Sequence, residues 1–420
     1  MDLIIRNAKL LTGNIADIGI KEGYIVSLNT VSDPSLSESP LSVSAPNSIN
    51  VNGMLVTPAL IDPHIHLDKV NILDVVRPNH SGTLSEAIEI IWEKKKTYTV
   101  TDIVDRASTV IEKAIKNGTL FMRTHVDVDT KGGLKPLEGV LALRDKYKHV
   151  IDIQIVAFPQ EGIIKDPGCD ALMVKAMEMG ANIVGGMPAN EKTPENSKKH
   201  VQFVFELASK FDADVDMHVD ETDDPFYRTL EMVADETLRT GWQERVTAGH
   251  TCALAAYDDH YAAYVMDKVK KAKIHMITNP VTNLMLQGRG DKQPIRRGIT
   301  RVKELLDRNI LVSFGQDCVR DTFYPFGSAD MMQIALITAH AAQMSLPHER
   351  TKLMEMITTD AAKILKLENY GLEVGCKANL VVFNTNSLDD AIGTQAERSY
   401  VIRNGRIVSK TITETIQTLE

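Results

Sequence analysis

Histidine and acidic residues close several apolar runs in this 420-residue chain. His64 and His66 follow the run LVTPALID, and side chains two apart on a strand face the same side, so both imidazoles could bind one ion. His218 ends ADVDMH, His250 ends RVTAGH, and Asp317 ends ILVSFGQD. Imidazole and carboxylate groups in this arrangement could hold a metal ion and activate water for hydrolysis.

Each of these residues has a simpler interpretation when it is taken alone. Histidines can be hydrogen-bonded or packed in a core, and Asp317 could cap the helix that follows it. Between residues 64 and 317, however, these residues follow one apolar run after another, and coincidence is a poor explanation for such a repeated pattern. Three neutral imidazoles and one carboxylate suit a borderline ion and leave a position open for water. The sequence therefore predicts a catalytic site with one divalent ion, Zn²⁺ or Fe²⁺.

The elements that must position these residues alternate between strands and helices from residue 57 to residue 368. Short apolar runs such as TLFMRTHVDV and DIQIVAF follow amphipathic segments such as VTDIVDRASTVIEKAIKNG. This alternation predicts βα units, and about eight parallel strands would close an α/β (β/α)8 TIM-like barrel with its chemistry at the C-terminal strand ends. The alternative is an open doubly wound sheet, but G-x-G-x-x-G is missing from a first strand–helix turn.

The two ends of the chain are β-rich and are expected to pair. Residues 1–56 contain LIIRNAKLL and DIGIKEGYIVSLN, and a Ser/Pro-rich segment at 32–50 predicts a loop. Near the C-terminus, Asn404-Gly405 is typical of a hairpin turn. We therefore predict a small β-sandwich domain from residues 1–56 plus 369–420, beside a catalytic barrel domain at 57–368.

The composition of the chain excludes some classes of protein and favours others. The formal charge of −9 argues against nucleic-acid binding and favours a small neutral or cationic substrate. The start MDLIIRNAKLLTGN and the lack of an apolar run near about 18 residues predict a cytoplasmic protein that does not insert in membranes. The four cysteines lie far apart without a C-x-x-C pair, which favours free buried thiols.

The chain resembles the amidohydrolase superfamily, and within it the bacterial cytosine deaminase branch, over nearly its whole length. The motifs that carry the resemblance include PHIHLDK, RTHVDVD, DIQIVAFPQEGI, VDMHVDETDD, RVTAGHT, ITNPVTNLMLQGR and SFGQDCVRDTFYPFG. The resemblance implies a TIM-like barrel beside a small sandwich. It also implies a set of metal ligands, namely His64, His66, His218 and Asp317.

The same resemblance implies roles in a hydrolytic deamination of a cyclic amidine. Glu221 would shuttle a proton to the ring nitrogen and later to the departing amino group. His250 would orient or stabilise the attacking hydroxide, and Asp317 would accept the proton of the water. Gln160 would bind the substrate through its amide, which offers both a donor and an acceptor. Homo-oligomers are common in this family.

Two positions depart from the cytosine deaminase pattern. Cys318 stands where that family usually has a second Asp, and Phe323 stands where it has Trp. Because both positions lie beside the substrate in the family, we expect creatinine, a cyclic guanidine, to be preferred to cytosine. The alternatives are cytosine or isocytosine deamination, and removal of an alkylamine from an s-triazine. A barrel that has lost catalysis is a further alternative, and it predicts gaps in the ligand set.

Overall fold

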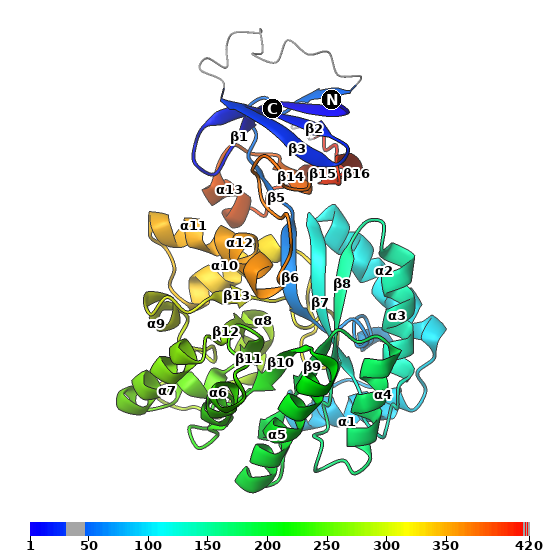
Figure 1. Ribbon diagram of the computed structural model, residues 1–420, viewed down its shortest axis with the longest axis vertical. Helices are drawn as coiled ribbons and strands as arrows, with labels where there is room; N and C mark the ends of the chain where they lie inside the picture. Colours follow the sequence, from blue (N-terminus) through cyan, green and yellow to red (C-terminus); the bar gives the residue numbers. More distant parts are fainter. Residues whose placement is uncertain (31–46, 415, 417, 419–420) are drawn as a thin grey trace.

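The computed structural model describes residues 1–30, 47–414, 416 and 418. Figure 1 shows a large barrel below and two small sheets above it, with both chain termini at the small sheets. The predicted architecture, a TIM-like barrel with a β-sandwich from the two ends of the chain, is confirmed. The division into domains 1–56 plus 369–420 and 57–368 stays a prediction.

The barrel is an eight-stranded sheet in which each strand pairs with the next along the chain. Where two neighbouring strands are paired, they run parallel, as the alternation of strands and helices predicts. The strands are β6 (Leu60–Ile65), β7 (Thr119–Asp127), β8 (Asp152–Phe158), β9 (Ile183–Gly186), β10 (Asp214–Val219), β11 (Val246–His250), β12 (His275–Thr278) and β13 (Val312–Phe314).

The closure of the barrel brings distant residues together. Ile65 forms a parallel bridge with Asp317, which lies just after β13. The Asp317 backbone N–H donates to the His64 carbonyl at 2.7 Å, and the His66 N–H donates to the Asp317 carbonyl at 3.0 Å. The backbone bonds that join the first and last barrel strands therefore also place Asp317 beside both histidines.

Helices surround the barrel because their apolar faces pack on the outside of the strands. In α2, the buried residues Ile103, Ala107, Val110 and Ile111 recur at helical spacing, and the Thr99 side chain caps the first turn. The α-helices are α1 (Leu84–Lys95), α2 (Val100–Lys116), α3 (Lys135–Tyr147), α4 (Cys169–Met179), α5 (Pro194–Phe211), α6 (Thr229–Thr240), α7 (Asp259–Lys271), α8 (Pro280–Leu286), α9 (Val302–Asp307), α10 (Met331–Ala341), α11 (Pro347–Met356), α12 (Thr359–Ile364) and α13 (Leu388–Gly393). Short 3-10 helices are η1 (Leu73–Val75), η2 (Pro188–Asn190) and η3 (Cys252–Ala255).

The two small sheets share an apolar core, to which Ile5, Ile18 and Leu380 contribute. One sheet contains β1 (Leu3–Lys9), β2 (Ile15–Lys21), β3 (Tyr24–Thr30) and β4 (Ser48–Asn50), and the other contains β5 (Val56–Pro58), β14 (Leu380–Phe383), β15 (Arg398–Arg403) and β16 (Arg406–Lys410). Asn404 and Gly405 join β15 to β16 with positive φ values of 48° and 74°, as the Asn-Gly signal predicts.

Two details differ from the sequence-based expectation. The predicted loop at 32–50 ends in a strand, because β4 pairs in parallel with β1; residues 32–46 lie outside the described residues. The run LVTPALIDPHIHL, expected as one strand, is divided at Ala59. The Ala59 N–H donates to Asn379 in the small sheet, whereas the Leu60 N–H donates to Gly118 beside the barrel. One apolar run therefore contributes a strand to each of two sheets.

Two composition-based expectations concern cysteines and membranes. Cys169, Cys252 and Cys318 are free and buried, and Cys376 is free and half-buried. Within the described residues, the helices are too short or too polar to cross a bilayer.

Candidate metal centre and active site

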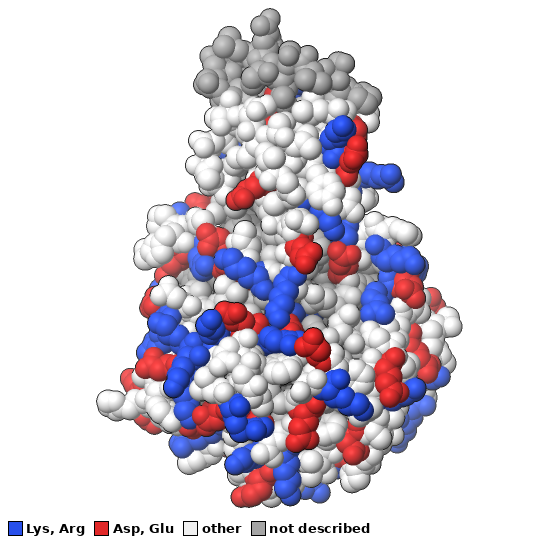
Figure 2. Space-filling model, viewed as in Figure 1, with Lys and Arg blue, Asp and Glu red and all other residues white. Residues whose placement is uncertain are grey.

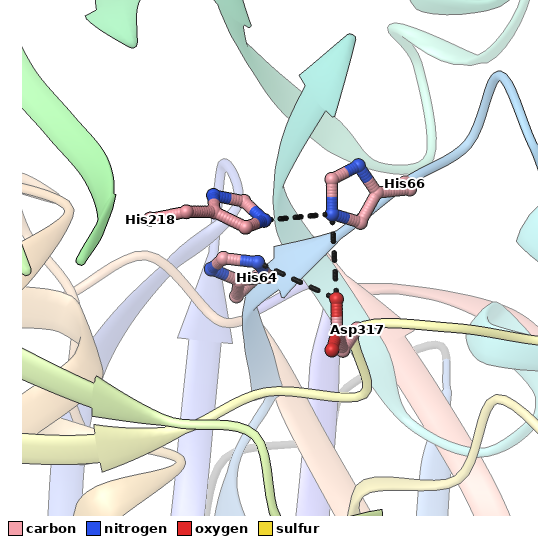
Figure 3. A group of neighbouring side chains, drawn as sticks. All are labelled: His64, His66, His218 and Asp317. Atoms are coloured by element: carbon pink, nitrogen blue, oxygen red, sulfur yellow. Dashed lines mark hydrogen bonds and ion pairs between the residues drawn. The ribbon is translucent and has the colours of Figure 1, made fainter. Parts of the chain in front are cut away.

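Four side chains from three parts of the chain converge at the C-terminal rim of the barrel (Figure 3). One potential ligand atom from each lies within 4.8 Å of the others, and all four residues are buried. The Nε2 atoms of His66 and His218 are 3.0 Å apart. The Asp317 Oδ1 lies 3.5 Å from the His64 Nε2 and 3.3 Å from the His66 Nε2. The predicted ligand set therefore meets at one point.

The donor atoms fit a divalent ion. Two neutral imidazole nitrogens at 3.0 Å can share at most one proton between them, whereas both can donate electron pairs to a cation. Among the described residues, both ring nitrogens of His64 and the Oδ2 of Asp317 are buried without a hydrogen-bond partner. Since a buried polar atom is normally satisfied, this grouping is typical of a metal site.

The electrostatics of the cluster favour the ligating forms. Burial lowers the pKa values of His66 and His218 well below the usual range, so both imidazoles are neutral. Burial opposes the negative charge of Asp317, but attraction to His250 and contacts with His64 and His66 outweigh it and lower the pKa of this carboxyl. The site thus offers neutral nitrogens and one carboxylate.

Local backbone geometry turns two of the functional side chains away from the regular strand path. His250 ends β11 with φ of 65°, and Asp317 follows β13 with φ of 61°. Positive φ values are uncommon in residues other than glycine and gather at functional sites. His64 and His218 instead lie within strands and His66 directly follows one, although the pairing of β6 with β7 is irregular between Asp62 and Ile65.

Glu221 and His250 lie next to the four-residue cluster. Glu221 is 3.3 Å from His250, between its Oε1 and the imidazole Nδ1. Burial raises the pKa of Glu221 well above that of an ordinary glutamate, which suits a group that carries a proton. Glu221, His250 and Asp317 also lie within 4.8 Å of one another through one atom each. The three expected catalytic residues are therefore brought together.

Two asparagines that the sequence reasoning left without a role hold His250. The Asn279 Nδ2 lies 3.0 Å from the His250 Nε2, and the Asn283 Nδ2 lies 2.9 Å from its Nδ1. Asn283, on α8, also donates to the Glu221 Oε1 at 3.4 Å. Asn283 thus bridges the imidazole and the carboxyl group.

We expect Asn283→Ala to lower kcat about tenfold, because loss of the contacts with both Glu221 and His250 would loosen their orientation. Metal content should be unchanged. Hydrolysis kinetics and elemental analysis would measure both, with Leu284→Ala, an exposed neighbour on α8, as the control. A rise in KM with kcat unchanged would contradict this positioning role.

A narrow cavity adjoins the cluster, and it contains all three residues expected to contact substrate. Gln160, Cys318 and Phe323 line it together with four residues of the metal and proton-transfer groups and with two that were not predicted, Lys69 and Thr282. His218 and Glu221 also line a neighbouring cavity of about 340 Å³. A larger cavity of about 1200 Å³ lies at the small sheets, away from these residues, so donor chemistry rather than volume identifies the site.

Cys318 is a neutral side chain in this cavity wall. Burial raises the pKa of its thiol well above the ordinary value, and the nearby carboxylates of Asp317 and Asp321 raise it further. Asp321 in turn accepts hydrogen bonds from the backbone N–H groups of Phe323 and Tyr324, both at 2.9 Å. Asp321 therefore holds the turn that carries Phe323.

Comparison with known proteins places this geometry in a family. Residues 48–409 match the family described as Amidohydrolase family. The structure of 5-methylcytosine deaminase from Klebsiella pneumoniae, liganded with 5-fluorocytosine, superposes with a TM-score of 0.93 and 35% identity over 99% of both chains. N-isopropylammelide isopropyl amidohydrolase of Pseudomonas sp. (strain ADP) is 32% identical over 97% of both chains. Pterin deaminase of Rhizobium rhizogenes is 29% identical over 85% of this chain and 81% of its own.

These findings confirm the resemblance to the cytosine deaminase branch, and they do not support the alternative of a barrel without catalysis. The chain belongs to the amidohydrolase family and is an enzyme that cleaves C–N bonds by hydrolysis.

Proposed function

We propose that this enzyme deaminates a cytosine-like pyrimidine, with 5-methylcytosine as the favoured substrate, and releases ammonia. The observation that carries the proposal is the convergence of His64, His66, His218 and Asp317 at one point, beside a cavity that three of them line together with Glu221. Similarity over the whole chain to a 5-methylcytosine deaminase supports the ring type. We propose Zn²⁺ or Fe²⁺ as the resident ion, since imidazole and carboxylate ligands suit both.

The residues divide the chemistry between them. When held by His64, His66, His218 and Asp317, a divalent ion would supply Lewis acidity and a hydroxide nucleophile near neutral pH. Asp317 accepts the proton of the attacking water, and His250, which lies beside Asp317 and Glu221, orients the oxygen that attacks the amidine carbon. Glu221 protonates the ring nitrogen next to that carbon. After it has regained the proton that Asp317 took from the water, it protonates the departing amino group, and ammonia leaves.

Cys318 favours a substituted ring. A thiol is smaller than the carboxylate usual in the cytosine deaminase pattern and carries no charge at neutral pH, because burial raises its pKa. A methyl group on the ring would therefore meet a neutral wall rather than a charge whose burial is costly. This argument supports 5-methylcytosine over cytosine.

The earlier expectation of creatinine stays a prediction. None of the relatives reported above is named for it, and the same neutral wall would accept its N-methyl group. Creatinine is thus the second candidate, followed by isocytosine and the N-alkylated s-triazines.

A screen of ammonia and amine release tests the proposal directly. Purified enzyme, loaded separately with Zn²⁺ and Fe²⁺, is assayed with 5-methylcytosine, cytosine, isocytosine, creatinine and N-isopropylammelide. We expect the highest kcat/KM with 5-methylcytosine. Faster turnover of creatinine, or release of isopropylamine without ammonia from the pyrimidines, would contradict the assignment.

Cys318→Asp is expected to reverse the ring preference. The added carboxylate would crowd the substituent and place a charge against it, so kcat/KM for 5-methylcytosine should fall about 10- to 100-fold relative to cytosine. Cys318→Ser, which keeps the size, is the matched control and should retain the preference. Competition assays with both pyrimidines measure the ratio, and an unchanged ratio in the Asp variant would refute the role of Cys318.

We also propose the setting in which the enzyme works. Figure 2 shows Lys/Arg and Asp/Glu side chains interspersed over the visible face of the barrel, which supports a small-molecule substrate rather than a nucleic acid. We propose further that the enzyme is cytoplasmic and forms a homo-oligomer.

A further inference from the structure

Lys69 is a buried cation in the wall of the substrate cavity. It follows β6 in the turn after His66, and its side chain is 1% exposed. Its Nζ donates to the Asp127 Oδ1 at 2.6 Å and to the Gln160 Oε1 at 3.1 Å. An ammonium group has three N–H donors, so these two bonds leave one donor unused among the described residues.

Lys69 also fixes the orientation of Gln160. An ammonium can only donate, so the Gln160 amide must turn its oxygen toward Lys69 and its NH₂ group elsewhere. The Gln160 Nε2 lies 3.5 Å from the Met187 sulfur, which is a weak acceptor. Gln160 therefore presents a donor to the cavity, and not both a donor and an acceptor as its amide alone suggested.

A buried ionic network keeps Lys69 charged and in place. Asp127 contacts a second buried lysine, Lys95, at 2.5 Å, and Lys95 also contacts Asp129 at 2.6 Å. Burial opposes the charge of Lys69, but Asp127 and Asp68 outweigh this effect and raise its pKa above the usual value. Lys95 is absent from the residues that line the narrow cavity, so Lys69 is the lysine of this pair that faces the substrate.

We infer that Lys69 is a specificity-determining residue that, with Gln160, binds a carbonyl oxygen on the substrate ring. The inference rests on the proposed function and names the feature that the site recognises. Two N–H donors on residues that line one cavity match the lone pairs of one ring carbonyl, such as the 2-oxo group of a pyrimidine. A ring that lacks this oxygen would leave the buried donors without an acceptor, which weakens its binding.

Two product-like rings test the inference without any need for turnover. Uracil carries the 2-oxo group, and 4(3H)-pyrimidinone lacks it. Dissociation constants are measured by calorimetry on metal-loaded wild type, Lys69→Met and Lys95→Met. The wild type should prefer uracil, and Lys69→Met should weaken uracil binding about 10- to 100-fold with little change for 4(3H)-pyrimidinone. Lys95→Met removes a charge from the same network and should keep the preference.

The outcomes separate this inference from the proposed function. Equal losses for both rings in Lys69→Met, loss of the preference in Lys95→Met, or a wild type without a preference for uracil would overturn it. Lys69→Ala also removes every donor at this position and is measured in parallel, so a misfolded Met variant leaves the inference testable; an unchanged preference in the Ala variant also overturns it. A Lys69-dependent preference in an enzyme that releases no ammonia from pyrimidines would uphold the inference and refute the proposed reaction.

Discussion

Replacement of Glu221 by Gln is expected to lower kcat by about 10²- to 10⁴-fold while the bound metal stays at wild-type level. Burial raises the pKa of Glu221, so the side chain can hold a proton beside the cluster and release it to the substrate. Glutamine has nearly the same shape but cannot transfer a proton in this way. Ammonia-release kinetics and elemental analysis of the same preparation would measure both quantities.

A nearby acidic residue provides the control for this substitution. Asp223 lies two positions further along the chain, is half-buried, and accepts a hydrogen bond from the Gly288 backbone at 2.7 Å outside the narrow cavity. Asp223→Asn should therefore leave kcat within a few-fold of wild type. If Glu221→Gln retained wild-type turnover, or lost its metal, proton transfer could not be the role of Glu221.

The residues that sequence reasoning identified share one property, since each lies at the C-terminal end of a barrel strand. Parallel strands in a closed barrel must bring these ends to one rim, so order along the chain was enough to predict that His64, His218 and Asp317 meet. The distance between Asp317 and the histidines at the end of β6 depends on closure, and the bridge between Ile65 and Asp317 sets it. The pattern of strands contains no information about this register.

The sequence does not predict the residues whose roles depend on buried contacts with distant parts of the chain. Lysine usually lies at the protein surface, so the motif PHIHLDK does not indicate that its lysine is buried. Only the fold shows that Lys69 contacts Asp127 and Gln160 away from water. Asn283 was within a recognised motif, but its bridge between Glu221 and His250 depends on where α8 lies. Long-range packing determines both contacts.

The sequence indicates only part of the polar layer around the metal centre, since it leaves open whether His125 supports a ligand or packs in the barrel. His125 stacks on His64 with ring centroids 4.0 Å apart, and its Nε2 lies 3.2 Å from Asp216. The Arg123 Nη1 donates to the other oxygen of Asp216 at 2.8 Å. Alternation in β7 and β10 shows that these side chains point to one face, but it does not show that the face is the barrel interior. There, Asp216 compensates the buried charge of Arg123, and His125 supports the ring of His64.

Replacement of His218 by Ala is expected to remove the metal ion and with it nearly all activity. His218 contributes one of the two imidazole nitrogens that lie 3.0 Å apart, and alanine offers no donor atom in its place. Loss of a partner that only supports a ligand typically weakens metal binding about 10- to 100-fold, so loss of a ligand should cost at least as much. Elemental analysis after gel filtration and activity with added Zn²⁺ or Fe²⁺ would measure the effect.

His275→Ala is the matched control for His218→Ala. His275 also lies on a barrel strand, but it begins β12 and is half-buried, whereas His218 lies near the C-terminal end of β10 beside the cluster. The control should keep both metal and turnover, which would show that removal of a barrel histidine does not by itself release the ion. If His218→Ala bound one ion per chain as tightly as wild type, the ion would have to be held elsewhere. The roles assigned to Asp317, Glu221 and His250 would then be wrong, because each role depends on a cation at the centre of these four side chains.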